Sequence, residues 1–442
     1  MPDSNRMTII ESVRREETAH VATAANGDRA LRAPIRVNGR TFDWPKRPTV
    51  VICYDGCDPE YIKAAREAHA VPTMERMIQA GFSGCARAAM PTFTNPNNLS
   101  IVCGAPPFIH GVSGNYYLDR ETNREVMMVD ATPVRAPTIL SVFSQAGANV
   151  VAITAKDKLR KALGKDLRGV AFSAEKSGSC TREENGIENV CGIVGRAVPD
   201  QYSADLSLFV LDAGVALLRT SRPDLMYLSL SDYVQHKHPP ESDEAISFMR
   251  NVDDRLAGLL DLGATVGIVA DHGMSDMAFD DGKPRVVFLA DRLDAEFSPG
   301  ATRVICPITD PFVRHHGALG GFVRVYIRDS SLDPKRVLHC LRSCEGVALA
   351  LFGAEASALF YLPVDREGDI AVIADKGFAL GGHAVDHDLT QLAGERLRSH
   401  GGIFEQEVPF ILSHPLSSDY AGRAKLGLRN FDIFEYAING VE

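Results

Sequence analysis

The amino-acid sequence predicts an α/β fold, in which a mostly parallel central sheet is covered by helices on both faces. Five short runs rich in Val, Ile, Leu and Tyr have the composition of buried strands, at residues 49–54, 149–154, 225–231, 265–270 and 408–412. Apolar residues at three- and four-residue spacing indicate amphipathic helices at residues 59–68, 72–80, 137–146, 206–220 and 243–260. Strands that are apolar throughout and alternate with helices are typical of a parallel sheet buried on both faces.

Charged side chains follow four of these strands at their carboxyl ends. Asp55, Lys156 and Asp232 each follow one strand, and Asp271 with His272 follows a fourth. Ligands of open α/β sheets bind outside the carboxyl ends of the strands. The sequence therefore predicts one site at one edge of the sheet, built from residues that lie far apart along the chain.

Residues 276–394 interrupt the alternation of strands and helices. This stretch has a strand-like run of its own at residues 322–327, a helix-like run at 334–343 and several loops. We therefore predict an inserted α+β cap domain at 276–394, and a metal-binding α/β core made of residues 33–275 and 395–442.

Length, charge and composition exclude several classes of protein. The chain has 442 residues, a net charge of −10 and a pI of about 5.7, whereas binding to nucleic acid needs a clustered basic surface. No apolar run reaches the roughly 18 residues of a membrane span, and residues 1–32 are polar and lack the apolar stretch of a signal peptide. We expect a cytoplasmic protein with an N-terminal arm at 1–32 and with neither membrane nor nucleic acid as a partner. The sequence does not fix the oligomeric state and leaves a homodimer open.

Two cysteine pairs have the spacing of zinc ligands, Cys53/Cys57 and Cys340/Cys344, among nine scattered cysteines. Neither pair has a second His or Cys pair to complete four ligands, and Cys53 falls inside a predicted buried strand. Free, mostly buried thiols are therefore expected.

Two segments have the spacing of metal ligands. Asp232 and His236 are four residues apart, so that one helical turn places both on the same face, and a carboxylate with an imidazole suits zinc. His238 competes for this role, although six residues fit one helical face less well. The run Asp271-His272-Gly273 ends an apolar strand and puts two adjacent ligands at the sheet edge.

Asp55 and His400 have weaker local signals. Asp55 follows a strand and precedes Gly56, which by itself is typical of an ordinary turn. His400 precedes two glycines and a predicted strand, whereas the alternatives His383 and His387 fall in the predicted cap and precede no core strand.

Thr94 is the candidate nucleophile. Residues 97–105 have a helical pattern, so Thr94 falls just before a helix N-terminus, where backbone N–H groups and the helix dipole favour an anion. A threonine at such a place is usually a helix cap, but a metal ion nearby would lower the pKa of its hydroxyl and make it a usable nucleophile.

These segments together supply seven groups: Asp55, Thr94, Asp232, His236, Asp271, His272 and His400. Seven groups suffice for two sites of three or four ligands, as a two-metal hydrolase requires. The mixture of His and Asp favours zinc over magnesium, which prefers oxygen ligands and water. The sequence therefore predicts two zinc ions per chain.

The order and spacing of these residues resemble the metal-site pattern of the alkaline phosphatase superfamily, in particular its nucleotide pyrophosphatase/phosphodiesterase branch. The matching segments are Asp-Gly at Asp55, Thr-x-Pro-Asn at Thr94, His-Gly-x-x-Gly-Asn at His110, Asp-x-x-x-His at Asp232, Asp-His-Gly at Asp271 and His-Gly-Gly at His400. Other segments are similar to a phosphonate-hydrolysing family of this branch: RVNGRTFDWP at 36–45, FTNPNNLSIVCG at 93–104, AKDKLRK at 155–161 and NFDIFEYAIN at 430–439.

The resemblance implies a role for each of these residues. One zinc ion would be held by Asp232, His236 and His400, and the other by Asp55, Thr94, Asp271 and His272. Asn115 would bind an oxygen of the phosphonate. Lys156 and Lys158 would bind the carboxylate of the substrate, and if their segment is extended it points both to one side. By themselves two such lysines are more often solvated surface groups, and Lys161 and Lys165 lie near.

The implied activity is zinc-dependent hydrolysis of the carbon–phosphorus bond of phosphonoacetate, a small anionic phosphonate, to acetate and phosphate through a phosphothreonine. The first alternative is a phosphodiesterase or nucleotide pyrophosphatase of the same superfamily, which would need an aromatic slot for the base. A cofactor-independent phosphoglycerate mutase-like enzyme would usually have Ser in place of Thr94. A non-catalytic binding module would not need seven ligands.

Overall fold

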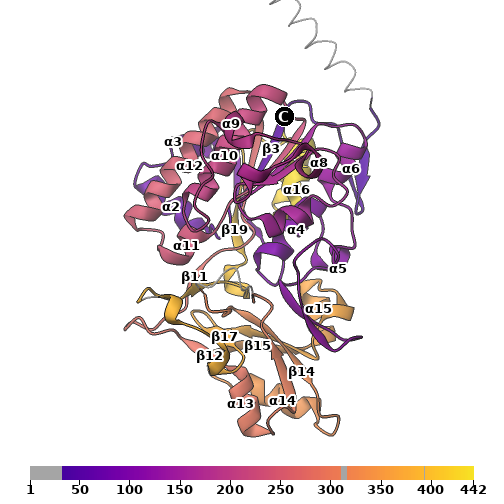
Figure 1. Cartoon of the computed structure of the whole chain (residues 1–442), viewed down its shortest axis with the longest axis vertical. Coiled ribbons are helices and arrows are strands. Elements are labelled where there is room, and N and C mark those ends of the chain that lie inside the picture. The colour runs from indigo at the N-terminus through magenta and orange to yellow at the C-terminus, as the bar shows by residue number, and fades with distance from the viewer. Residues whose placement is uncertain (1–31, 310–315, 393) are drawn as a thin grey trace, which may run out of the picture.

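The computed structural model describes residues 32–309, 316–392 and 394–442, so that the predicted arm at 1–32 lies almost entirely outside the described residues (Figure 1). The central sheet has eight strands: β3 (Thr49–Cys53), β4 (Phe82–Arg87), β7 (Val150–Thr154), β8 (Val170–Ser173), β9 (Leu225–Ser229), β10 (Thr265–Val269), β19 (Glu407–Leu412) and β20 (Leu428–Arg429). Their order across the sheet is β20-β4-β19-β10-β3-β9-β7-β8. All five strands predicted from the sequence are present.

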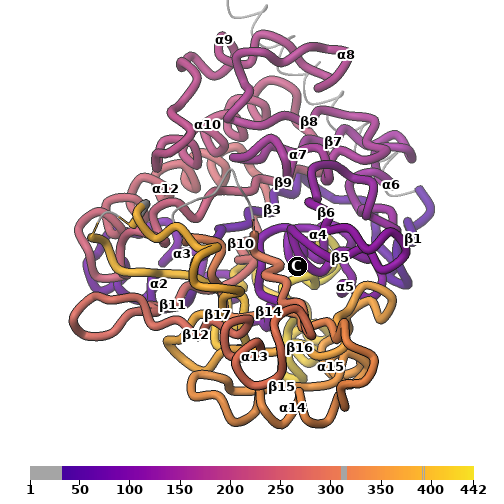
Figure 2. The backbone as a smooth tube through the Cα atoms, turned by 60° about the horizontal axis from the view of Figure 1, so that its bottom comes forward, coloured from indigo at the N-terminus to yellow at the C-terminus, as the bar shows by residue number. Residues whose placement is uncertain are grey.

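Strands β10, β3, β9, β7 and β8 run parallel to one another. Figure 2 shows them one after another across the core. In this sheet β19 runs the other way, antiparallel to both of its neighbours, β10 and β4. Every residue of β3, β7, β9 and β10 is buried, which explains why these strands are apolar throughout. The predicted mostly parallel sheet is confirmed.

Helices cover both faces of the sheet (Figure 1). On one face, α12 (Asp243–Asp261) packs against α2 (Pro59–Glu67), α3 (Pro72–Ala80) and α10 (Asp205–Ser221). On the other face, α4 (Thr94–Cys103) packs against α6 (Ile139–Gln145) and α17 (Ile433–Glu435). Within the described part of the chain, none of the helices has the length and apolar character needed to cross a membrane. All nine cysteines are free thiols, and most are buried, as expected.

A second sheet lies within the predicted insertion. It consists of β13 (Thr302–Ile305), β14 (Phe322–Ile327), β16 (Ile370–Ala374) and β15 (Val347–Phe352), in that order and with all neighbours antiparallel. Helices α13 (Leu289–Glu296) and α14 (Pro334–Arg342) pack against it. The predicted strand at 322–327 and helix at 334–343 are thus present. The division of the chain into core and cap domains stays a prediction.

Two of the contacts between the predicted insertion and the rest of the chain are made by strands. Strand β11 (Ser275–Asp276), where the chain leaves the core, pairs with β18 (Arg398–Ser399), where it returns. Strand β14 then alternates between two environments. Val323 and Val325 belong to the apolar core of the insertion, whereas Phe322 packs edge-on against Phe93, with ring centroids 6.5 Å apart. Arg324 lies on the same face as Phe322 because side chains of a strand alternate.

Candidate active site

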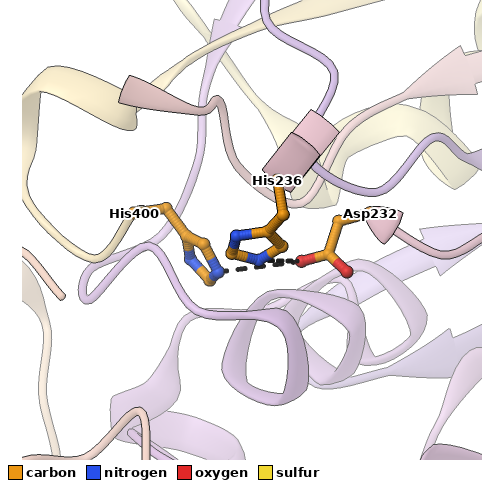
Figure 3. Close-up of side chains that lie close together, drawn as sticks. All are labelled: Asp232, His236 and His400. Carbon is orange, nitrogen blue, oxygen red and sulfur yellow. Dashed lines mark ion pairs between the residues drawn. The ribbon is translucent and has the colours of Figure 1, made fainter. Parts of the chain in front are cut away.

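Asp232, His236 and His400 form a first cluster (Figure 3). Asp232 follows β9, and His236 lies four residues on, in the short helix α11 (Tyr233–Lys237). The Nε2 atom of His236 is 2.9 Å from Asp232 Oδ2, and Nε2 of His400 is 3.8 Å from the same oxygen. One atom from each residue lies within 4.8 Å of the others, a spacing that could hold a metal ion.

His400 reaches this edge of the sheet because β19 is antiparallel to its neighbours. It lies between β18 and β19. Phe410 pairs with Val269, the last residue of β10, so the amino-terminal half of β19 extends beyond the carboxyl end of β10. A residue that precedes an antiparallel strand therefore arrives at the same edge as residues that follow parallel strands.

Asp55, Asp271 and His272 form a second cluster, which is buried. Asp55 follows β3, and Asp271 with His272 follows β10. Nε2 of His272 is 3.2 Å from Asp55 Oδ1 and 3.7 Å from Asp271 Oδ2. The two clusters adjoin, since the rings of His272 and His400 stack with centroids 3.5 Å apart.

The three histidines share one hydrogen-bonding arrangement. Each Nδ1 faces a backbone carbonyl oxygen: that of Arg398 at 2.7 Å from His236, that of Thr92 at 2.7 Å from His400 and that of Gly273 at 2.8 Å from His272. A carbonyl oxygen only accepts, so Nδ1 carries the proton and Nε2 keeps a lone pair for its cluster. Histidines that bind metals are oriented in this way, so the arrangement fits metal binding.

The charges of the buried Asp and His side chains also fit metal binding. Burial, followed by repulsion from Asp232 and Asp271, raises the pKa of Asp55 well above its usual range, and burial also raises the pKa of Asp271. Burial would lower the pKa of His272, but Asp271 and Asp55 raise it to about 10. Burial and then His272 lower the pKa of His400. Without a metal ion, the proton that His272 retains offsets the charge of these buried carboxylates. A bound metal ion would displace that proton and stabilise the ionised carboxylates in its place.

Thr94 is the first residue of α4, and its Oγ1 lies 3.2 Å from Nε2 of His272. The helix begins three residues earlier than the sequence pattern predicted, because Pro96 falls in the first turn, where a backbone N–H is not needed. The Asn97 side chain holds the preceding loop by accepting from Ala89 N and donating to the carbonyl oxygen of Phe93. Thr94 thus joins the second cluster at a helix N-terminus, where an anion is favoured.

A cavity of about 370 Å³ opens over both clusters. Eight of the ten predicted site residues line it: Asp55, Thr94, Asn115, Lys156, Lys158, Asp232, His236 and His400. The other two, Asp271 and His272, are fully buried in the second cluster, next to Asp55. The fold therefore brings all ten residues together.

Lys156 and Lys158 lie on the cavity wall that follows β7. Nζ of Lys156 donates to the carbonyl oxygen of Gln201 at 3.0 Å and lies 5.2 Å from the centroid of the Tyr202 ring. The segment is not extended throughout: Lys156 is the extended cap residue of α7 (Asp157–Leu163), and Lys158 lies in its first turn. Both side chains nevertheless reach the same cavity. Lys165 instead donates to the carbonyl oxygen of Val134.

Asn115 comes from the His-Gly-x-x-Gly-Asn segment and is 9% exposed. Among the described residues, its Oδ1 has no hydrogen-bond partner. An unpartnered buried amide group is costly, and turning the amide would place its N–H₂ at the same position. A ligand with polar oxygens in the cavity would satisfy this side chain.

Asn98 is a site residue that the sequence analysis missed. It lies one helical turn after Thr94, and its Nδ2 donates to Asp271 Oδ2 at 3.0 Å. Its Oδ1 accepts from the hydroxyls of Tyr227 and Ser229 at 2.7 and 2.8 Å, which fixes the amide orientation. The four-residue spacing from Thr94 was a usable signal, since such residues share a helix face.

His316 and Tyr202 were also missed. His316 is 3% exposed, lines the cavity and has its ring centroid 5.5 Å from that of His236. Tyr202 lines the cavity beside Lys156. No local pattern marks either residue, because long-range packing brings them to the site.

The competing histidines lie outside both clusters. Nδ1 of His383 is 2.8 Å from Asp291 Oδ1, and Nδ1 of His387 is 2.7 Å from the carbonyl oxygen of Gly317. His238 pairs with Glu244 across 3.8 Å.

Known proteins are similar to this chain in sequence and in fold. Residues 49–402 match the family described as type I phosphodiesterase / nucleotide pyrophosphatase. Phosphonoacetate hydrolase from Sinorhizobium meliloti 1021, in crystal structures with phosphonoformate and with phosphonoacetate, is 48% and 46% identical, with TM-scores of 0.87 and 0.86. Both alignments cover 92% of this chain and 98% of that one.

Other relatives share less sequence identity with this chain. Murine ectonucleotide pyrophosphatase / phosphodiesterase 5 is 16% identical, with a TM-score of 0.58 over 88% of this chain and 93% of that one, which shows a common fold alone. Ectonucleotide pyrophosphatase/phosphodiesterase family member 3 of Rattus norvegicus is 25% identical over 261 residues, which are 57% of this chain and 27% of that protein. The matched segment of the chain thus spans about a quarter of that relative.

The family match extends over most of the chain and includes every candidate metal ligand from Asp55 to His400. It confirms the superfamily resemblance expected from the motifs. The chain belongs to the type I phosphodiesterase / nucleotide pyrophosphatase family.

Proposed function

We propose that this protein hydrolyses the carbon–phosphorus bond of phosphonoacetate and releases acetate and phosphate. The observation that carries the proposal is a single cavity lined by Thr94, Lys156, Lys158, the whole first cluster and Asp55 of the second. Phosphonoacetate has a phosphonate at one end and a carboxylate at the other, so its site needs cationic groups in two places. The 48% identity to phosphonoacetate hydrolase over 92% of the chain supports the same substrate.

Two zinc ions are proposed as the cofactors. One would be held by Asp232, His236 and His400, and the other by Asp55, Asp271, His272 and the hydroxyl of Thr94. A mixed set of imidazole and carboxylate ligands suits zinc. When bound, such ions act as Lewis acids, lower the pKa of a coordinated hydroxyl and offset negative charge on the phosphonate.

Thr94 is the proposed nucleophile. Its hydroxyl gives up a proton, and Oγ1 attacks phosphorus at the N-terminus of α4. A bond from phosphorus to Oγ1 forms while the bond to carbon breaks, which gives a phosphothreonine. Water then attacks the phosphorus, phosphate leaves, and Oγ1 regains a proton. The net reaction consumes one water molecule.

The leaving group defines the task of the lysines. The electron pair of the broken bond delocalises into the adjacent carboxylate as an enediolate, which takes a proton at carbon and becomes acetate. Cations at the carboxylate stabilise this developing charge more than they stabilise the substrate, and only that difference speeds the step. Lys156 is oriented for the task by the Gln201 carbonyl oxygen and the Tyr202 ring, and Lys158 would share it.

Asn115 would donate its amide N–H to an oxygen of the phosphonate. Its side chain is nine-tenths buried and lines the cavity, so a hydrogen bond there would be shielded from water. Such a donor is useful where negative charge on oxygen changes during the reaction.

A phosphodiesterase or nucleotide pyrophosphatase is the second candidate. The family match agrees with it equally well, and Tyr202 and Tyr233 in the cavity wall offer aromatic surface for a base. The same clusters and Thr94 would serve both reactions, so groups away from phosphorus must decide between them.

Phosphate release from a small substrate panel tests the proposal. Zinc-loaded protein should release phosphate from phosphonoacetate but not from methylphosphonate, whose leaving carbanion has no carboxylate to share its charge. Bis-p-nitrophenyl phosphate should be a poor substrate. Rapid cleavage of that diester without phosphate release from phosphonoacetate would overturn the proposal and favour the phosphodiesterase. A cytoplasmic location stays a prediction.

A further inference from the structure

We propose that Arg324, held by Glu367, is a positioning residue that fixes the loop carrying Asn115 and thereby sets how well the phosphonate is bound. The inference rests on the proposed contact of Asn115 with a phosphonate oxygen. It assigns a role in the reaction to the inserted segment, whereas the proposed metal ligands and nucleophile all lie outside it.

Asn115 lies in the connection between α5 (Pro107–His110) and β5 (Tyr116–Asp119). Residues 111–114 of this connection belong to no helix or strand. Backbone that lacks regular hydrogen bonds takes its geometry from its surroundings, so the groups that pack around the connection determine where the Asn115 side chain points.

Arg324 holds this connection at Ser113, two residues before Asn115. Its Nη2 donates to both the carbonyl oxygen and the hydroxyl of Ser113, each at 3.0 Å. Glu367 holds the guanidinium through two further hydrogen bonds, Nε to Oε1 at 2.7 Å and Nη2 to Oε2 at 3.0 Å. Arg324 is 0% and Glu367 2% exposed. A buried two-point ion pair of this kind permits one orientation of the guanidinium.

Other groups of the insertion hold the same loop. Nη1 of Arg366 donates to the carbonyl oxygen of Gly111 at 2.6 Å. The carbonyl oxygen of Pro307 accepts from the backbone N–H of Asn115 at 2.7 Å. Gly114 is packed so closely that an added β carbon would lie 2.6 Å from the Pro307 side chain. The conformation of the loop therefore depends on contacts with the insertion, whereas the Asn115 side chain of the loop lines the cavity.

Stability alone is a weak reason for the buried pair. Replacing a buried ion pair by apolar residues of similar volume is often neutral or stabilising, because taking charges out of water is costly. The placement of Arg324 suggests a different role. On the same face of β14, Phe322 packs against Phe93, the residue before Thr94. One face of one strand thus supports both the proposed nucleophile and the proposed phosphonate donor.

A double-mutant cycle tests the role of Arg324. Arg324→Lys keeps the positive charge but loses the planar fork, so kcat/KM for phosphonoacetate and for p-nitrophenyl phosphate should both fall roughly 10- to 100-fold, the effect of a misplacement of about 1 Å. In an Asn115→Ala background the same substitution should change kcat/KM less than about twofold, because the side chain that it positions is already gone.

Two further variants complete the experiment. Arg342→Lys alters another arginine of the insertion, which donates to the carbonyl oxygen of Ala350, and should leave both activities unchanged. Ser113→Ala removes the hydroxyl that accepts one of the two hydrogen bonds from Nη2 to Ser113. It should show the same dependence on Asn115, which keeps the test available if Arg324→Lys does not fold. Zinc content and thermal melting verify the folded state of each variant.

Equal losses with and without Asn115 would overturn the inference, since they would show a general structural role. No loss from either Arg324→Lys or Ser113→Ala would overturn it as well. If the parent protein hydrolysed p-nitrophenyl phosphate but not phosphonoacetate, the proposed substrate would be wrong. The cycle would then still decide the role of Arg324 on the remaining substrate.

Discussion

Replacing Lys156 by Ala should slow the hydrolysis of phosphonoacetate far more than that of p-nitrophenyl phosphate. The two proposed metal sites and Thr94 would act on phosphorus and would meet the same oxygens in both substrates. The carboxylate is the part that differs, and the Lys156 ammonium in the cavity wall is a group placed to bind it. p-Nitrophenyl phosphate has no carboxylate for this ammonium to hold.

The size of the effect follows from the contact that is lost. A hydrogen bond to a charged group contributes about 1.5–3 kcal/mol, and about 1.4 kcal/mol is a factor of ten in rate. The kcat/KM for phosphonoacetate should therefore fall roughly 10- to 150-fold. Most of the loss should appear in kcat, because the negative charge at the carboxylate grows as the carbon–phosphorus bond breaks.

Phosphate and p-nitrophenol release by wild type, Lys156→Ala, Lys158→Ala and Lys165→Ala measures this difference. Lys165→Ala is the matched control, because Lys165 donates to Val134 and does not line the cavity. Equal losses on both substrates would mean that the lysines act on phosphate or on folding. If the hydrolysis of neither substrate were slowed, the proposal that the lysines bind the carboxylate would be refuted. The phosphodiesterase hypothesis would then be favoured.

Three more predictions concern the metal clusters and the nucleophile. Purified protein should contain about two zinc ions per chain by elemental analysis. His400→Ala should remove most of the activity, whereas His383→Ala and His238→Ala should not. Protein that contains one zinc ion or none and stays active in chelator would contradict the two-zinc proposal. Thr94→Ala should fold but lose turnover, and Thr94→Ser should retain part of it; turnover near the wild-type rate in Thr94→Ala would exclude the phosphothreonine. Metal-free protein should lose stability as pH rises through the interval from 6.5 to about 10, because Asp271 and Asp55 raise the pKa of His272 across that interval in the folded state. A raised folded-state pKa gives stability that is complete below the unfolded value and is lost as pH passes the folded value. Thermal melts of chelated and zinc-loaded protein should show this loss in the chelated sample alone.

Strand composition made most of the core predictable. Residues of β3, β7, β9 and β10 are buried on both faces, so their sequences are apolar throughout and end sharply at Asp55, Lys156, Asp232 and Asp271. Because parallel strands end at one edge of a sheet, the sequence also predicted that these groups would meet. His400 was predicted on its glycines and the strand that follows. The antiparallel direction of β19, which brings it to the same edge, depends on pairing between distant segments.

Local backbone details were less predictable. The start of α4 was predicted too late because of Pro96, since proline is compatible with a helix only in the first turn, where no N–H bond is required. The sequence did not determine the conformation of the Lys156–Lys158 segment, for which an extended backbone was considered as one way to point both lysines to one side. A helix cap followed by a helical turn brings them to one cavity by a different route.

Separate elements of this fold supply the chemistry at phosphorus and the recognition of the rest of the substrate. The groups that would act on phosphorus come from the ends of β3, β9 and β10, the start of α4 and the segment before β19. The groups that would hold the carboxylate come from the connection between β7 and α7 and from the first turn of α7. A change confined to that connection would alter the cavity wall without moving either metal cluster. The net charge of −10 gives the protein no general attraction for an anion, so local cations must attract the substrate. We therefore infer that substrate choice depends on the connection between β7 and α7, and that the insertion contributes to it by holding Asn115 in place.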